Sequence, residues 1–154
     1  MVEVKTTGIE DTIKEFEKLV RDEEVIFKRT MYPGVKVVAD YMRSQIKSLK
    51  TTKHYKAKGK RYATENEIKG LIESMGVTPI RKYGDDYDAN VGFDGYNQHV
   101  RTKPANQKIA NFINRGTSYM KAQPFLTRTK SATQAQAIEA MREAMDEEIT
   151  KRTK

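Results

Sequence analysis

The sequence predicts an α+β fold, with helices in the N-terminal half, a small antiparallel β-sheet near residues 77–93 and a long C-terminal helix. Apolar residues recur every three or four positions in the first and last thirds of the chain, as on one face of a helix. Strict alternation of apolar and polar residues is confined to residues 86–93, so helices and strands are segregated along the chain. The 154 residues suffice for one domain, 1–154, with an ordinary hydrophobic core.

Two helices are predicted before residue 50. Thr7 and Glu10 fit a capping box in front of a helix over residues 9–22. A second helix is predicted over residues 34–49, with a helical approach before it, and Pro33 should begin or kink this helix because it has no amide hydrogen. The apolar stripe of the first helix consists of Ile9, Ile13, Phe16, Leu19 and Val20.

The middle of the chain combines a short helix with a hairpin. Thr64 and Glu67 form a second capping-box match, which predicts a helix over residues 64–75, with Gly76 as the residue that ends it. Residues 77–83 and 87–93 are then the two strands of a hairpin that turns at Gly84 and Asp85. Pro79 cannot join a central ladder, so its strand is an edge strand or is bulged.

Two further helices complete the prediction. Ile109, Phe112 and Ile113 have a spacing that favours a short helix ending at Gly116 over a strand with a turn. Pro124 suits the start of the last helix, which we expect over residues 124–151. Residues 94–106, between the second strand and the short helix, are predicted to form a loop.

The net charge of +8 comes from two blocks of the sequence. Residues 50–61 carry six bases and residues 95–138 carry seven, and neither block contains an acid. Such blocks stay solvated or face an anion, of which nucleic acid is the obvious one. We expect mobile basic loops near residues 50–63 and 94–106. The basic residues expected to serve in assembly or to face DNA are Lys53, Lys56, Lys58, Lys60, Arg61, Arg101, Lys103 and Lys108.

The chain offers little for catalysis. With no cysteine, disulfides, zinc–thiolate sites and cysteine nucleophiles are excluded, and a reducing cytoplasm is the simplest compartment. Phosphate-binding loops and nucleophile-elbow motifs are absent from the sequence. His54 and His99 lie in basic loops, where surface histidines are the simpler interpretation than ligands of a metal-dependent enzyme. We therefore predict a non-enzyme without catalytic residues, cofactor or metal, and without a membrane span or signal peptide.

A string within residues 110–126 carries a family resemblance. It contains Phe112-Ile113, then Gly116-Thr117-Ser118, Met120, Ala122, Pro124 and Phe125, followed by the long helix. It resembles the signature of the head–tail connector, or tail-completion, family of tailed bacteriophages, typified by gene product ten of phage Hong Kong ninety-seven. Residues 8–19, 34–40, 64–71 and 91–93 resemble the family in the same order. Asn114-Arg115 and Lys121 depart from the pattern, where an acidic residue and a proline are common.

The resemblance implies a structural protein of the phage neck, in the virion and, during assembly, in the cytoplasm of the bacterial host. It implies a ring of identical subunits between the connector or head-closure protein and the tail-tube or tail-terminator protein, with the free subunit monomeric or oligomeric. The basic loops would then face the DNA channel or acidic neighbours, and we expect them to order on assembly.

The family string also has a local physical interpretation. Gly116 permits a positive φ, the hydroxyls of Thr117 and Ser118 can bind turn amides, Ala122 allows close packing and Phe125 anchors the next helix. An alternative function remains open from the charge alone, namely a small basic nucleic-acid-binding protein. In that case, the bases of the nucleic acid would stack on the aromatic residues near the basic blocks. These are Tyr55, Tyr62, Tyr96 and Tyr119.

Overall fold

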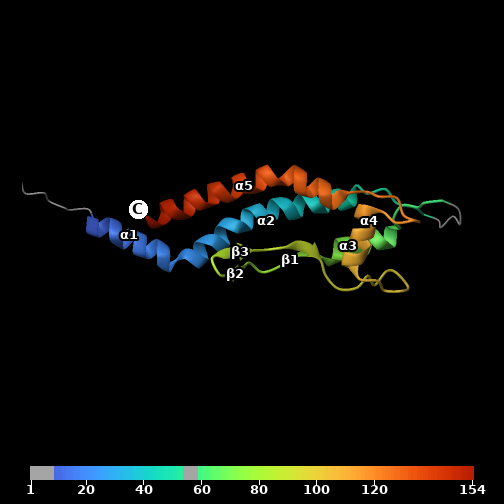
Figure 1. Ribbon diagram of the computed structural model, residues 1–154, viewed down its shortest axis with the longest axis horizontal. Helices are drawn as coiled ribbons and strands as arrows, with labels where there is room; N and C mark the ends of the chain where they lie inside the picture. The colour runs from blue at the N-terminus through green and yellow to red at the C-terminus, as the bar shows by residue number, and fades with distance from the viewer. Residues whose placement is uncertain (1–8, 54–58) are drawn as a thin grey trace, which may run out of the picture.

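The α+β fold is confirmed by the computed structural model, which describes residues 9–53 and 59–154, apart from the side chains of residues 9 and 10. The molecule is elongated, with α1 and the C-terminus at one end and α3, α4 and the loops around them at the other (Figure 1). In chain order, the elements are α1 (Ile9–Arg21), α2 (Glu23–Lys47), α3 (Glu65–Ser74), β1 (Met75–Val77), β2 (Arg81–Tyr83), β3 (Asp86–Asp88), β4 (Val91–Phe93), α4 (Asn106–Arg115) and α5 (Phe125–Arg152).

The long helices α2 and α5 run side by side in opposite directions and form the spine of the molecule (Figure 1). They approach closely at Gly34, where an added Cβ would lie 2.2 Å from Met141 Cε and 3.0 Å from the carbonyl oxygen of Ala137. Thr129 and Thr133 of α5 have small, buried side chains, which also allow the two helices to pack closely. Each hydroxyl donates to the carbonyl four residues earlier, so these polar groups are satisfied inside the pair.

Pro33 was expected to begin or to kink the second helix, and the first of these alternatives is wrong. The helix begins at Glu23 and continues through Pro33 to Lys47. Proline removes one backbone hydrogen bond from the helix, but it leaves the amphipathic pattern on both sides intact. Ile26 and Thr30 before the proline and Val35 after it are all buried. Burial of one continuous face therefore outweighs the local cost of the proline.

The four strands form one hairpin that lies along α2 and is divided into two short ladders (Figure 1). β1 pairs with β4, with Val77 opposite Val91, and β2 pairs with β3, with Arg81 opposite Asp88. Three residues separate the ladders on one strand and two on the other, so the side that contains Pro79 carries one extra residue. The sequence left open whether this strand is an edge strand or is bulged. Each ladder has two strands, so every strand here is an edge strand, and Pro79 lies in the gap between the ladders.

The predicted hairpin turn and its half-buried strand are also confirmed. Gly84 has a φ of +61°, the left-handed conformation for which glycine is suited, and it lies between the paired residues Tyr83 and Asp86. Tyr87 and the alternating apolar positions up to Phe93 are partly buried, while Asp86, Asp88 and Asn90 are exposed. The Tyr87 ring stacks on Phe27 of α2 at 4.7 Å, which fixes the hairpin to the spine.

The role predicted for Gly76 is wrong. Helix α3 ends at Ser74, and Met75 is already extended, with φ −68° and ψ 127°, so the chain passes directly into β1. Gly76 belongs to that strand and pairs with Gly92. Sequence position alone did not distinguish a helix-ending glycine from a glycine in a strand, because the distinction here depends on pairing with β4.

The hydrophobic core lies at the end of the molecule formed by α3 and α4. Leu71, Ile113 and Phe125 are completely buried there, and the Phe93 ring of β4 meets the Phe125 ring edge to face at 6.2 Å. Helix α2 contributes Met42 and Ile46 to the same cluster. The core therefore joins both long helices, both short helices and the hairpin at one end.

Candidate functional site

The two basic blocks of the sequence meet at the core end of the molecule. A hollow of about 560 Å³ is lined by Thr52 and Lys53 from the first block and by His99, Val100 and Arg101 from the second. Its remaining wall is formed by Thr64, the N-cap of α3, and by Glu65 and Asn66 of its first turn. Lys53 and Arg101 are exposed and come from loops that are 48 positions apart in sequence. This hollow is the place where an anion would meet both blocks at once.

Five of the predicted basic residues are exposed around this end of the molecule. Lys108 also lies 5.6 Å from the Phe112 ring, and Lys103 has a φ of +45°, which is uncommon for a residue with a side chain. Lys56 and Lys58 lie outside the described residues. The mobility of both loops stays a prediction. The five exposed residues are Lys53, Lys60, Arg101, Lys103 and Lys108.

Tyr62 contributes an aromatic ring among these cations. Lys121 Nζ lies 4.9 Å from the centre of the Tyr62 ring, and Lys50 Nζ lies 5.9 Å from it. Ammonium groups at such distances from a ring are attracted by its π electrons. The arrangement brings the first basic block beside the segment that precedes α5, and it places two positive charges around one aromatic ring.

Arg61 differs from the other predicted basic residues because it is part of a partly buried ion pair. Its two terminal nitrogens donate to the two carboxylate oxygens of Glu67, each at 2.9 Å, and only 14% of its side chain is exposed. Its backbone amide donates to Tyr119, and its carbonyl accepts from Lys121. Arg61 therefore holds the first basic loop against α3 and against the segment before α5.

Glu67 also completes the predicted capping box of α3. Its carboxylate accepts from the Thr64 amide at 2.7 Å, while the Thr64 hydroxyl accepts from the Glu67 amide. Burial raises the pKa of this carboxyl, but the hydrogen bonds from Arg61 and Thr64 outweigh burial, and the net pKa lies below the ordinary value of 4.5. One carboxylate thus joins the basic loop to the start of the helix.

We expect this pair to make the stability of the protein sensitive to acid. Because the folded-state pKa of Glu67 is lowered, its contribution is complete above about pH 4.5 and is lost as the pH falls through the folded value. Glu67→Gln should lower the free energy of unfolding at neutral pH by about 1–3 kcal/mol. In this variant, the free energy of unfolding should also fall less steeply with decreasing pH than in the parent protein. Urea unfolding at several pH values measures this.

Glu65 provides the matched control, since it lies on the same helical turn and is exposed. Glu65→Gln should leave both the stability at neutral pH and the shape of its pH dependence close to those of the parent protein. An equal effect of the two substitutions would contradict the role given to Glu67. Glu148 also has a lowered pKa, through its hydrogen bond with Arg152, so some acid sensitivity should remain in the Glu67 variant.

The second basic loop is held by a buried asparagine. Asn97 is completely buried, and its side-chain nitrogen donates to the carbonyls of Asn66 and Glu67 on α3 at 3.2 Å. Its side-chain oxygen accepts from the His99 amide, and its own amide donates to Pro104. These bonds place the His99 and Arg101 side of the hollow relative to α3.

The segment with the family resemblance forms the junction between α4 and α5. Gly116 ends α4 with a φ of +76°, as predicted, and an added Cβ would lie 3.0 Å from the Ala122 nitrogen. The Thr117 hydroxyl accepts from the amides of Tyr119 and Met120, whereas Ser118 is exposed. Met120 is buried, and Phe125, directly after Pro124, begins α5 inside the core. The junction is therefore tightly packed.

Two polar residues of this junction were missed by the sequence analysis. The Asn114 side chain on α4 accepts from the amides of Leu126 and Thr127, which supplies the cap that α5 lacks from its own residues. Gln123 exchanges two hydrogen bonds with the backbone of Lys50, at 2.9 and 3.0 Å. These contacts span 12 and 73 positions of sequence, so no local motif announces them.

An ion cluster holds the opposite end of the molecule. Glu148 of α5 is 7% exposed and contacts Arg152 and Arg29, and Arg152 also reaches Asp22 between α1 and α2 at 3.3 Å. The hydrogen bond with Glu148 raises the pKa of Arg152, which remains charged. The cluster fixes the end of α5 to the corner between α1 and α2.

His99 does not belong to a metal site in the part of the chain that the structure describes. His99 pairs with Glu73, with Nε2 and Oε2 2.6 Å apart, and this contact lowers the pKa of Glu73. His54 lies outside the described residues. Across 9–53 and 59–154, no group of three or more histidines and carboxylates could hold a metal ion. None of the helices in these ranges is long and apolar enough to cross a membrane.

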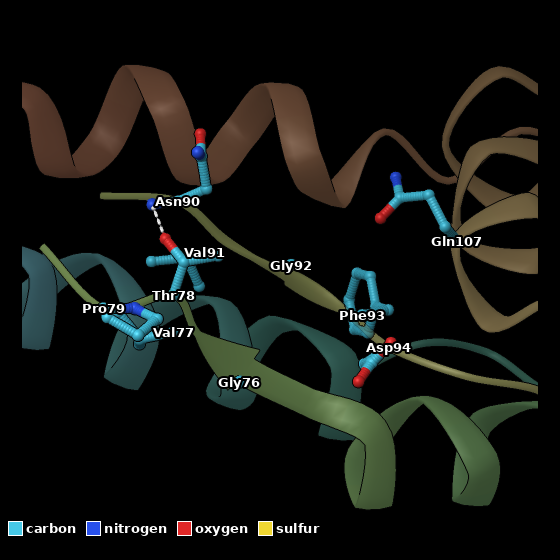
Figure 2. A pocket seen from close by; sticks show the side chains of 10 residues that line it. All are labelled: Gly76, Val77, Thr78, Pro79, Asn90, Val91, Gly92, Phe93, Asp94 and Gln107. Carbon is cyan, nitrogen blue, oxygen red and sulfur yellow. Dashed lines mark hydrogen bonds between the residues drawn. The ribbon is translucent and has the colours of Figure 1, made fainter. Parts of the chain in front are cut away.

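A second hollow, of about 590 Å³, lies on the β1–β4 ladder (Figure 2). The paired glycines Gly76 and Gly92 leave its floor open, and the Thr78 hydroxyl accepts from the Asn90 amide along its edge. Asp94 is the one ionisable residue among those described as lining it, and its carboxylate accepts from the next amide in a turn. This lining suits an apolar contact better than acid–base chemistry.

Comparisons with protein-family models, with curated proteins and with solved structures find no match to this chain.

Proposed function

We propose that the protein is a non-enzymatic structural component of the neck of a tailed bacteriophage or prophage, which joins head and tail by forming a ring. The observation that carries the proposal is that an elongated subunit has exposed cations at one end and exposed apolar residues at the other. Exposed cations gather around α3 and α4, while Ile13, Phe16 and Val20 form an exposed apolar stripe on α1. These elements lie at opposite ends of the molecule (Figure 1). Surfaces of this kind are suited to docking.

One feature suits the subunit to a ring. Its junction between α4 and α5 is held by Asn114 and Gln123, so the basic end is rigidly connected to the α2–α5 spine. In a ring, the basic end would face the DNA channel or an acidic surface of the connector, head-closure, tail-tube or tail-terminator protein. At either location, negative charges on the partner would offset the repulsion among the cations of the basic end.

Electron microscopy of particles made without this protein tests the proposal. We expect filled heads and finished tails that fail to join, and addition of the purified protein should restore joined particles. Joined, infectious particles in the absence of the protein would overturn the neck function.

Nucleic-acid binding is the second candidate, favoured by the hollow that unites Lys53 and Arg101 and by Tyr62 between two lysines. If DNA is bound there, Lys53→Ala and Arg101→Ala should each weaken binding and reduce its salt dependence by about one counterion. Lys14→Ala, at the α1 end, is the control and should leave binding unchanged. Fluorescence anisotropy with labelled DNA across a salt series measures both quantities.

Tight binding that survives about 200 mM salt would favour this second function, because contacts to phosphates alone weaken steeply in that range. Weak binding, lost at that salt and unaffected by the two substitutions, would exclude the hollow as a DNA site.

A further inference from the structure

Helix α1 presents an apolar stripe that the described residues leave uncovered. Ile13, Phe16 and Val20 lie on one face of the helix and are 50%, 63% and 71% exposed. They surround a shallow hollow of about 410 Å³ together with Glu17 and Arg21. Single exposed apolar residues are ordinary, but a row of three on one helical face is typical of a surface that binds a partner.

An apolar groove lies elsewhere on the molecule, between α2 and the hairpin. It has a volume of about 650 Å³ and lies beside Tyr32 and Val77, which are 68% and 46% exposed. Val77 and Pro79 also border the hollow of Figure 2, so they form a ridge between two depressions. The segment between β1 and β2, which is one residue longer than the segment between β3 and β4, lies at this ridge. A helix with protruding apolar side chains matches such a surface.

Glu17 beside the α1 stripe and Arg29 beside the groove carry opposite charges. Helix α1 carries four acids and three bases, and the charged residues that border its stripe are Glu17 and Arg21, of which Arg21 lies 3.6 Å from Asp22 of its own copy. The described lining of the groove carries two cations, Lys28 and Arg29, and no carboxylate. Lys28 is paired with Glu24 at 2.6 Å, whereas Arg29 gives one nitrogen to Glu148 at 3.4 Å. A guanidinium has five N–H groups, so Arg29 can bind a second carboxylate.

We propose that the α1 stripe of one copy docks in the α2–hairpin groove of a second copy, with Glu17 of the first facing Arg29 of the second. The two surfaces differ, so the contact is heterologous and leaves one stripe and one groove free on every pair. Repetition of such a contact produces a ring when the rotation closes. The inference rests on the proposed neck function only for ring closure, since the contact itself concerns two copies.

The contact should be weak between two isolated copies. The stripe spans eight residues, or about 10 Å of helix, and should bury less than the 1,200–2,000 Å² of a standard interface. Chemical trapping at high protein concentration is therefore the suitable experiment, and the absence of cysteine from the chain makes it clean. Val20 and Val77 are exposed, so cysteine at either position should not disturb folding.

The experiment mixes tagged Val20→Cys protein with untagged Val77→Cys protein under mild oxidation. We expect a disulfide-linked pair of unlike copies, and a ladder of multimers from the double variant V20C/V77C. Adding Phe16→Ser to the Val20→Cys copy should lower the yield of the linked pair about tenfold or more, because a large apolar side chain is lost from the contact. Ile138→Cys, 51% exposed on α5, is the matched control and should not link to Val20→Cys.

Preferential linkage of Val20→Cys to itself would show α1 pairing with α1 and would overturn the inference. Absence of the unlike pair at every concentration would also overturn it, as would a yield that Phe16→Ser leaves unchanged. These failures are distinct from failure of the neck function, because the microscopy of particles does not depend on which surfaces the copies use.

Discussion

Replacement of Phe125 with alanine is expected to lower the free energy of unfolding by about 3–5 kcal/mol. The side chain is completely buried where α5 enters the core, and its ring meets Phe93 of β4. Alanine would remove the contacts of the ring and leave a cavity between α5, the hairpin and the short helices. Since a domain of this kind is stabilised by about 5–15 kcal/mol in total, a large part of its stability would be lost.

Urea unfolding followed by circular dichroism measures this effect as a shift of the midpoint at constant slope. Phe125→Leu should cost less than about 1.5 kcal/mol, since it keeps most of the volume. Phe16→Ala is the matched control, because the same chemical change on the exposed α1 stripe should alter monomer stability by less than about 0.5 kcal/mol. Equal losses at positions 125 and 16 would contradict the assignment of the core.

Local sequence patterns predicted most elements of the fold because the information needed was local. The helix over 9–22 is observed as Ile9–Arg21, and the helix over 124–151 as Phe125–Arg152. The capping box at Thr64 and the positive φ of Gly116 were likewise predictable, since each concerns a few consecutive residues. Such features follow from periodicity and backbone geometry without knowledge of distant partners.

The predictions failed where distant residues decide the outcome. Pro33 lies inside α2 because the helix is buried along one face on both sides of it, and Gly76 lies in a strand because Gly92 pairs with it. Periodicity indicated that α1 is amphipathic, but it carries no information on what covers the apolar face.

The candidate site was predicted in part. The basic blocks were found from composition, but their meeting at one hollow depends on Asn97 and Gln123, whose hydrogen bonds connect segments far apart in sequence. Arg61 was grouped with the solvent-facing cations, although a signal for its pairing was present. Glu67, six residues later, was already assigned to the capping box of α3, and its carboxylate can accept from Arg61 as well.

The loop that carries Arg101 depends on a glycine in the facing helix. Gly70 of α3 is buried, and an added Cβ would lie 2.2–2.6 Å from three side-chain atoms of Asn97. Gly70→Ala must therefore displace Asn97 from its bonds to α3 and to the His99 amide. Alanine favours the helix by up to about 1 kcal/mol, but overpacking and the lost hydrogen bonds should give a net loss of about 1–3 kcal/mol.

A double-mutant cycle separates this steric effect from the general effect of alanine. Asn97→Ala removes all three atoms that the new Cβ would meet, so Gly70→Ala should be neutral or slightly stabilising in that background, as measured by urea unfolding. Gly76→Ala is the matched control, since no atom lies within 4 Å of its added Cβ, and it should change stability little. Equal costs of Gly70→Ala with and without Asn97 would show that the glycine is not needed to seat this asparagine, and the second basic loop would then be positioned by other contacts.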